Sequence, residues 1–358
     1  MPTGFLPRTI SLDGREHRYV VYVPPGYTKE REWPLLVFLH GMGECGTDGK
    51  KHVDVGLGPA MKKDRERWPF VVVFPQKPDR ESQWIDHEAL VIGVLDATVK
   101  EYRISAQQRL LTGLSQGGAG TWALGAKHAD KFAAIAPVCG YGRPAKVAEA
   151  LKNMPIWAFH GVDDKAVPAQ QSKDLCAAVK EAGGDPLLTL YENTAHNSWD
   201  KAYRESNLAE WLRLLPFDPV LARALTRPEE LKAFYMYIDS VRSSRTTEGL
   251  AIEVDGLGRL TVATRSEDSL STLCDRTMIR GDAARCLSDC VRLLARSGAT
   301  DIHRNYGADL REYVSIDYRY GNGDRSASPW PKRFELTEKP DAVVSAIRQV
   351  EEMLRNLR

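Results

Sequence analysis

The residues best suited to do chemistry are a serine, an aspartate and a histidine in three separate segments. Ser115 lies in Gly113-Leu-Ser-Gln-Gly117, a G-x-S-x-G turn that follows an apolar run from Leu110 and precedes residues that favour a helix. In such a turn the serine occupies a strained strand-to-helix bend, and the glycines avoid clashes that a Cβ would cause. The pattern predicts a nucleophile at the end of a strand, and an ordinary loop serine is the alternative.

A serine hydroxyl is a poor nucleophile near neutral pH, so it needs a base and an anion that orients the base. His196 follows the apolar run 187–191 and is the candidate base, whereas Asp164 follows the run 156–160 and is the candidate acid. The order Ser, Asp, His along the chain is one of those that known catalytic triads follow. Asp163 remains an alternative acid, and either carboxylate could instead cap the helix that follows.

A glycine-rich loop, His40-Gly-Met-Gly-Glu-Cys-Gly46, follows the apolar run 35–39. Such a loop can direct backbone N–H groups at a developing oxyanion, and a plain tight turn is the alternative reading. His40 and His160 each precede a glycine at the end of an expected strand. We expect both to set the conformation of their loops by hydrogen bonding, because His196 fits the chain order of a base better.

Three further side chains lie in the loops that follow expected strands. Trp84 and Trp199 could form walls of a substrate site or fill the core. Cys139 also follows a strand, but no basic partner accompanies it in sequence. We therefore expect a packed thiol rather than a nucleophile at this position.

Apolar runs alternate with helical patterns through about residue 216. The expected strands lie at 18–23, 35–39, 70–74, 110–114, 132–138, 156–160 and 187–191, and the expected helices lie at about 88–102, 119–126, 169–182 and 199–214. Strands that are apolar throughout and alternate with helices indicate a mostly parallel sheet covered on both faces. The prediction is a three-layer α/β domain over residues 1–216, whose functional loops gather at the carboxyl ends of the strands.

Four segments of this domain together resemble the α/β-hydrolase esterases of the polyhydroxybutyrate depolymerase and feruloyl esterase type. They are Phe38-Leu-His-Gly-Met-Gly-Glu44, Gly113-Leu-Ser-Gln-Gly117, His160-Gly-Val-Asp-Asp164 through Val167-Pro168, and His196-Asn-Ser-Trp199 with Ala202-Tyr203. Within that group the chain is most similar to the predicted-peptidase or phospholipase/carboxylesterase-like branch. The resemblance covers about the first 216 residues, and the region after Pro216 is not part of it.

The resemblance implies a role for each matching residue. It makes Ser115 the nucleophile, His196 the base and Asp164 the acid, and it makes the backbone N–H groups of Met42 and Gln116 the oxyanion hole. Gly41, Trp84 and Trp199 are the candidate substrate-binding residues. No metal and no cofactor are expected.

The region after Pro216 differs in composition, because arginine replaces lysine as its main basic residue. Residues 217–247 are expected to form a linker helix, which begins near Arg227 and ends near Val241. Strands 250–254 and 260–264 flank a hairpin turn, a helix runs from Asp282 to Gly298, strands follow at 314–320 and 333–336, and a last helix starts at Pro340. The order ββαββα predicts a small α+β domain over residues 248–358, of unknown role, that could mediate a homodimer or bind a protein partner.

Composition restricts the partners. The formal net charge of +1 gives no electrostatic case for nucleic acid, and no apolar run has the length of a membrane span. Six scattered cysteines form no disulfide framework, and the Cys286/Cys290 pair lacks the second pair of a zinc site. The start of the chain carries no visible export signal, which favours the cytoplasm, although a processed secreted protein would look the same.

The sequence therefore favours a serine carboxylic-ester hydrolase that acts through an acyl-enzyme. Only a short segment separates Val138 from Pro155, which leaves no room for a large cap domain. An open cleft suits short acyl or aryl-acyl esters of bulky or polymeric alcohols better than long lipid chains. A serine peptidase or acyl-peptide hydrolase, and a non-catalytic binding protein on the same scaffold, are the alternatives.

Overall fold

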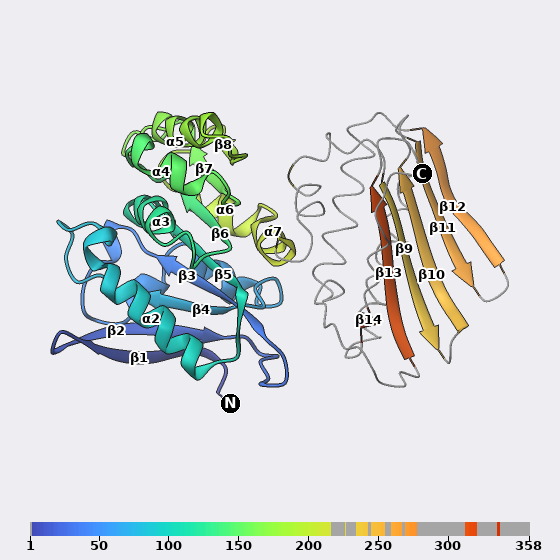
Figure 1. Cartoon of the computed structure of the whole chain (residues 1–358), viewed down its shortest axis with the longest axis horizontal. Coiled ribbons are helices and arrows are strands. Elements are labelled where there is room, and N and C mark those ends of the chain that lie inside the picture. The colour runs from blue at the N-terminus through green and yellow to red at the C-terminus, as the bar shows by residue number, and fades with distance from the viewer. Residues whose placement is uncertain are drawn as a thin grey trace. The chain divides into compact units, whose positions relative to one another are not determined.

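The computed structural model describes residues 2–215, residue 226 and the strands at 234–242, 245–254, 259–266, 269–277, 312–320 and 335–336. The chain divides into two compact units, Met1–Pro216 and Phe217–Arg358 (Figure 1). Each unit has a sheet of its own. Among the helices of the described ranges, none is long and apolar enough to cross a bilayer.

The first unit is built on an eight-stranded sheet in the order β1-β2-β4-β3-β5-β6-β7-β8. β1 and β2 form an antiparallel hairpin, β2 pairs antiparallel with β4, and all other neighbours are parallel. The strands are β1 (Gly4–Leu12), β2 (Arg15–Val23), β3 (Trp33–Leu39), β4 (Val71–Pro75), β5 (Ile104–Leu114), β6 (Ala134–Val138), β7 (Trp157–Gly161) and β8 (Leu187–Tyr191). The mostly parallel sheet predicted from the sequence is confirmed.

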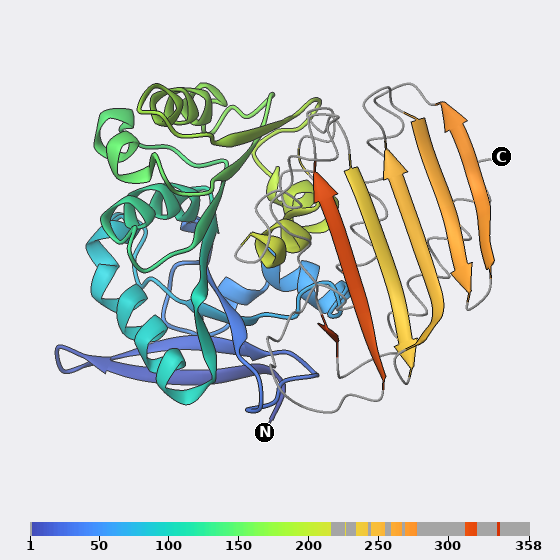
Figure 2. The ribbon, with the colours of Figure 1, turned by 45° about the vertical axis from the view of Figure 1, so that its right-hand side comes forward.

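Helices cover both faces of this sheet. α2 to α5 lie along one face and α1, α6 and α7 along the other (Figures 1 and 2). The helices are α1 (Leu57–Lys63), α2 (Glu88–Glu101), α3 (Gln116–Lys127), α4 (Pro144–Leu151), α5 (Gln170–Glu181), α6 (Trp199–Arg204) and α7 (Leu208–Leu214), with short 3-10 helices η1 (Met42–Glu44), η2 (Lys51–Val53) and η3 (Trp84–His87). The three layers explain why the central strands are apolar throughout.

The strand β3 illustrates this double burial. Leu35, Val37 and Leu39 enter the core that the sheet shares with α2 to α5. Phe38 points to the other face, where its ring lies 5.4 Å from that of Phe74 and 5.9 Å from that of Tyr203 in α6. A strand buried on both sides fixes the loop at its carboxyl end, which is the glycine-rich loop that begins at His40.

One helix expected from the sequence is two helices in the structure. The run 199–214 breaks between α6 and α7, because the guanidinium of Arg67 reaches the backbone carbonyls of Arg204, at 2.6 Å, and of Ser206. Arg67 also pairs with Glu210 in α7 at 3.2 Å, and both side chains are buried. A buried cation that takes up the carbonyls at the end of a helix gives that helix a natural stop.

The second unit contains a six-stranded sheet in the order β12-β11-β10-β9-β13-β14, and every pair in it is antiparallel. Its strands are β9 (Phe234–Arg242), β10 (Arg245–Val254), β11 (Arg259–Ser266), β12 (Ser269–Thr277), β13 (Glu312–Tyr320) and β14 (Glu335–Leu336). The predicted hairpin of β10 and β11 is confirmed by their register, which pairs Ile252 with Val262. The helices expected at 282–298 and from Pro340 lie outside the described residues.

Within the segment 217–247, for which a linker helix was expected, residues 234–242 and 245–247 are strands, and there the expectation is wrong. Phe234–Arg242 is the strand β9, which pairs with β10 on one side and with β13 on the other, and β10 already begins at Arg245. The segment Phe-Tyr-Met-Tyr-Ile is rich in aromatic and β-branched residues, which favour strands. A proline near the start of the segment favours a helix only weakly, whereas β9 is hydrogen-bonded to a neighbouring strand on each side.

Candidate active site

Ser115 joins β5 to α3 in a strained backbone conformation. Its φ of 55° and ψ of −118° lie where residues other than glycine are rarely found, and its N–H donates to the Val138 carbonyl at 2.9 Å. A Cβ at Gly113 would lie 2.5 Å from the Gly117 carbonyl oxygen, and one at Gly117 would lie 2.0 Å from that of Leu39. The two glycines therefore allow the bend to pack directly against the end of β3.

The three residues singled out in the sequence meet at the carboxyl ends of the strands. Ser115 Oγ lies 2.9 Å from His196 Nε2, and His196 Nδ1 lies 2.7 Å from Asp164 Oδ2. His196 comes from the loop between β8 and α6, and Asp164 comes from the loop after β7. With Nδ1–H donating to the carboxylate, Nε2 is free to accept the serine proton. The imidazole is partly exposed, whereas the carboxylate is buried.

Asp164 is held by more than the histidine. Its Oδ1 accepts the backbone N–H groups of Ala166 and Val167, each at 2.9 Å, and its Oδ2 lies 3.3 Å from His160 Nε2. The neighbouring Asp163 is exposed. Of the two carboxylates left open by the sequence, Asp164 is the one that the structure brings to His196.

His160 has the loop-setting contacts that the sequence suggested. Its Nδ1 lies 2.7 Å from Ser172 Oγ, and its Nε2 lies 2.9 Å from the Val167 carbonyl. Burial lowers the pKa of His160, which keeps the ring neutral near pH 7. The ring therefore braces the turn whose backbone donates to Asp164.

The two expected oxyanion donors begin two different helices. Met42 is the first residue of η1 and Gln116 is the first residue of α3, and the first N–H groups of a helix have no acceptor within it. The two segments lie close together at Gly41. A Cβ at this glycine would lie 3.6 Å from the Ser115 Cβ and 2.9 Å from Leu114 Cδ1, so a larger residue would force the segments apart. The backbone around Ser115 can thus present donors to a negative oxygen.

Of the two tryptophans, Trp84 is corrected by the structure. It is fully buried, and its indole Nε1 donates to the His40 carbonyl at 2.9 Å, so it supports the glycine-rich loop from beneath and is not a wall of the substrate site. Trp199 is partly exposed, and its ring lies 5.4 Å from that of His196 in an edge-on arrangement. Its role toward substrate stays a prediction.

Cys139 lies beside these residues. Its Sγ, a carboxylate oxygen of Asp164 and a ring nitrogen of His196 lie within 4.8 Å of one another. Burial raises the pKa of the Cys139 thiol to about 12, and a protonated thiol is a weak nucleophile and a weak metal ligand. Asp164 and His196 already engage each other, so this group suits a proton relay better than an ion.

Two polar residues that the sequence reasoning passed over hold the glycine-rich loop. Gln76 Nε2 donates to the Glu44 carbonyl at 3.1 Å, and the Gly46 N–H donates to the Lys77 carbonyl at 2.9 Å. Both side chains are buried. The sequence signal for these two residues is that both are polar and directly follow the apolar strand β4. Polar residues at such a position usually indicate only that the strand ends.

A mostly parallel sheet, helices on both faces and a serine at a strained strand-to-helix bend define an α/β-hydrolase. Residues 11–213 match the family model of the putative esterases. The chain therefore belongs to the putative esterase family, as the resemblance predicted.

The curated relatives carry related names. The chain is 27% identical over 168 residues to a bifunctional acetylxylan esterase/xylanase of Neocallimastix patriciarum, covering 42% of this chain and 22% of that protein. It is 35% identical over 167 residues to acyl-protein thioesterase 1 homolog 2 of Dictyostelium discoideum, covering 39% of this chain and 74% of that protein. The chain thus spans less than a quarter of the length of the first relative.

Among solved structures, a thermostable esterase is 35% identical, with a TM-score of 0.53 over 58% of this chain and 62% of that one.

Proposed function

We propose that this protein hydrolyses carboxylic esters through an acyl-enzyme formed on Ser115. The observation that carries the proposal is the unbroken chain from Ser115 Oγ to His196 to Asp164, with distances of 2.9 and 2.7 Å. Membership of the putative esterase family supports the ester as the bond that is cleaved.

The first half of the reaction forms the acyl-enzyme. Ser115 Oγ attacks the ester carbonyl carbon while His196 Nε2 takes the hydroxyl proton, and the Met42 and Gln116 N–H groups donate to the oxygen that becomes negative. Asp164 fixes the imidazole and stabilises its positive charge. The tetrahedral species then expels the alcohol, which takes the proton from His196, and leaves the acyl group on Ser115.

Water completes the cycle. It attacks the acyl carbonyl carbon as His196 accepts its proton, and the bond to Ser115 breaks as that proton returns to the serine oxygen. The same groups act twice, so the site needs no second base.

We further propose short acyl or aryl-acyl esters of bulky or polymeric alcohols as the substrates. β6 ends at Val138 and β7 begins at Trp157, and the eight residues of α4 lie in that connection, which leaves no space for a large cap domain there. The acetylxylan esterase among the relatives points the same way, whereas the thioesterase relative makes thioesters the competing class.

The decisive experiment compares Ser115→Ala with Ser11→Ala, which changes an exposed serine on the edge strand β1. Ser115→Ala should abolish nitrophenyl acetate hydrolysis and labelling by a fluorophosphonate, while Ser11→Ala keeps both. Turnover by folded Ser115→Ala protein would overturn the assignment.

The substrate class needs a separate assay. Acetylated xylan and a feruloyl ester should be cleaved faster than a long-chain ester, an acyl thioester and a peptide anilide at equal concentration. Preference for the long-chain ester, the thioester or the anilide would replace the proposed substrate and leave the serine mechanism intact.

A further inference from the structure

We infer that His40 is a positioning residue that aims the Met42 N–H at the oxyanion through the peptide unit between Gly41 and Met42. The inference rests on the proposed function, because it gives this peptide a catalytic task. It concerns a histidine that lies outside the Ser115–His196–Asp164 chain.

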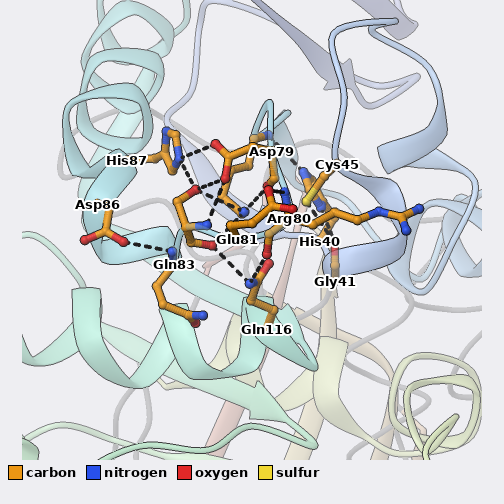
Figure 3. Close-up of polar contacts among 12 residues, drawn as sticks. His40, Gly41, Cys45, Asp79, Arg80, Glu81, Gln83, Asp86, His87 and Gln116 are labelled. Atoms are coloured by element: carbon orange, nitrogen blue, oxygen red, sulfur yellow. Dashed lines mark hydrogen bonds and ion pairs between the residues drawn. The ribbon is translucent and has the colours of Figure 1, made fainter.

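The peptide unit between Gly41 and Met42 has its carbonyl firmly held. His40 Nδ1 lies 2.6 Å from the Gly41 oxygen, and the Cys45 thiol donates to that oxygen at 3.9 Å (Figure 3). The Glu44 N–H also donates to it, at 3.4 Å. In a planar trans peptide the C=O and the following N–H point in opposite directions. Fixing the Gly41 oxygen therefore fixes the direction of the Met42 N–H.

The preceding peptide is fixed as well. The carbonyl of His40 accepts the Trp84 indole N–H at 2.9 Å, and the two rings lie 4.8 Å apart, edge to face. Both peptide units that flank Gly41 are thus held by buried donors. Little rotation about the Gly41 backbone is left, although glycine alone would permit it.

A second contact decides which nitrogen of His40 carries the hydrogen. The backbone N–H of Lys77 donates to His40 Nε2 at 3.0 Å. Since Nε2 is an acceptor, a neutral ring must carry its hydrogen on Nδ1, where it faces the Gly41 carbonyl. Burial lowers the pKa of His40 to about 3, so the ring keeps this tautomer throughout the neutral range.

The loop that follows Lys77 also reaches the second oxyanion donor. The Lys77 ammonium is buried and donates to the carbonyls of Asp79 and of Ser82, the latter at 2.8 Å. The Gln116 side chain donates to the carbonyls of Arg80 and Ser82, at 3.2 and 3.0 Å (Figure 3). One loop therefore contacts both segments that carry the proposed oxyanion donors.

Two substitutions of His40 separate positioning from packing. His40→Asn places an amide N–H near the position of Nδ1 but leaves a cavity, whereas His40→Gln fills more space and places its amide near Nε2. If His40 acts through the Gly41 carbonyl, Asn is the better replacement for activity. If it only fills space, Gln is at least as good.

The kinetic experiment measures kcat and KM for nitrophenyl acetate, the affinity for a boronic acid that forms a tetrahedral adduct with Ser115, and the thermal midpoint of each variant. His40→Gln should lower kcat by about 10²-fold, the cost of one oxyanion donor, with KM nearly unchanged and boronate affinity reduced in parallel. His40→Asn should recover most of that loss despite a lower thermal midpoint.

Equal losses in the two variants, or losses that follow the thermal midpoint, would overturn the inference. A second readout does not depend on turnover: nitrogen-15 NMR of labelled histidine should show His40 neutral with its hydrogen on Nδ1 at pH 5. An Nε2–H tautomer would overturn the inference even in an active enzyme, whereas a wild-type protein without turnover or phosphonate labelling would instead refute the proposed function.

Discussion

At the scale of single residues, Asp164 shows how a buried charge is made tolerable. The carboxylate is buried, yet its two oxygens accept two backbone N–H groups and the His196 ring, and the neutral His160 lies beside it. Each of these donors offsets part of the cost of burying the carboxylate. In the proposed reaction the same carboxylate stabilises the imidazolium that forms at His196.

Replacing this carboxylate by an amide should therefore be costly for catalysis but not for folding. Asp164→Asn should lower kcat by about 10⁴-fold, because the amide favours the wrong tautomer of the histidine. Asp163→Asn is the matched control, since that side chain is exposed, and should change kcat less than about twofold. Steady-state kinetics with nitrophenyl acetate provides the comparison, and the reverse ranking would move the acid to Asp163.

Buried histidines give the fold a defined response to acid. Burial lowers the pKa of His52 from 6.5 to about 4, so the unfolded chain binds a proton at a higher pH than the folded protein does. The free energy of unfolding contributed by His52 is unaffected above about pH 6.5 and falls as the pH drops toward 4. Lowering the pH therefore reduces the free energy of unfolding through protonation of His52 in the unfolded chain.

The substitution His52→Leu tests that sign. Between pH 6.5 and 4.5 the wild type should lose about 2–3 kcal/mol more of its free energy of unfolding than the variant does. The reason is that His52 binds a proton in the unfolded wild type over this pH range, whereas a leucine binds none. Urea unfolding at several pH values measures both. Parallel pH curves for the two proteins would show that His52 has the same pKa in the folded and unfolded states, which would contradict the effect of burial.

At the scale of elements, the strained bend at Ser115 is kept in place by what lies under it. The glycines of the bend, Gly113 and Gly117, lie against the end of β3. The Ser115 N–H donates to the Val138 carbonyl at the end of β6. A serine held between two central strands cannot relax without moving the sheet. This is the reason that the bend tolerates its unusual backbone angles.

Gly117→Ala should accordingly destabilise the whole first unit. The new Cβ would lie 2.0 Å from the Leu39 carbonyl oxygen, and relieving a backbone clash costs about 3 kcal/mol or more. Gly26→Ala is the control, because its Cβ would meet only a Trp33 ring atom at 3.9 Å. Chemical denaturation should show a large loss for the first variant and little change for the second; equal stabilities would mean that the bend is free to move.

Elements whose signals are local were predictable, and those that depend on distant partners were not. The strand 187–191 and the segments around Ser115, Asp164 and His196 were assigned from apolar runs and glycine positions. The edge strand β1 alternates between half-buried and exposed positions from Leu6 to Leu12, but Pro7 and Arg8 interrupt the apolar pattern in the sequence, so the strand was missed. The break between α6 and α7 depends on Arg67, which is 137 residues away from its partner Arg204.

The candidate site divides in the same way. Chain order sufficed to suggest the serine, the acid and the base, since each stands at a strand end. The support beneath them could not be predicted, because the Trp84 indole N–H and the Lys77 backbone N–H both donate to His40, which lies 44 and 37 residues away. Trp84 was misassigned for this reason: a loop position in the sequence says nothing about whether the ring points into the core or into solvent.

At the scale of the whole molecule, the described residues that build the site belong to the first unit. Its eight strands form one sheet, both faces of that sheet are covered by helices of the same unit (Figure 2), and Ser115, Asp164 and His196 all lie within it. The second unit has a separate antiparallel sheet. A hydrophobic core of this extent is sufficient for independent folding.

Residues 1–216 produced alone should therefore fold cooperatively and hydrolyse nitrophenyl acetate with a kcat/KM within about threefold of the full chain, since each proposed catalytic group and each brace is retained. Any effect of the second unit would then be confined to large substrates, such as acetylated xylan, or to the oligomeric state found by light scattering. A fragment that folds with its native circular dichroism but is not labelled by a fluorophosphonate would contradict this division. It would show that residues 217–358 complete the active site, so that the two units act as one enzyme.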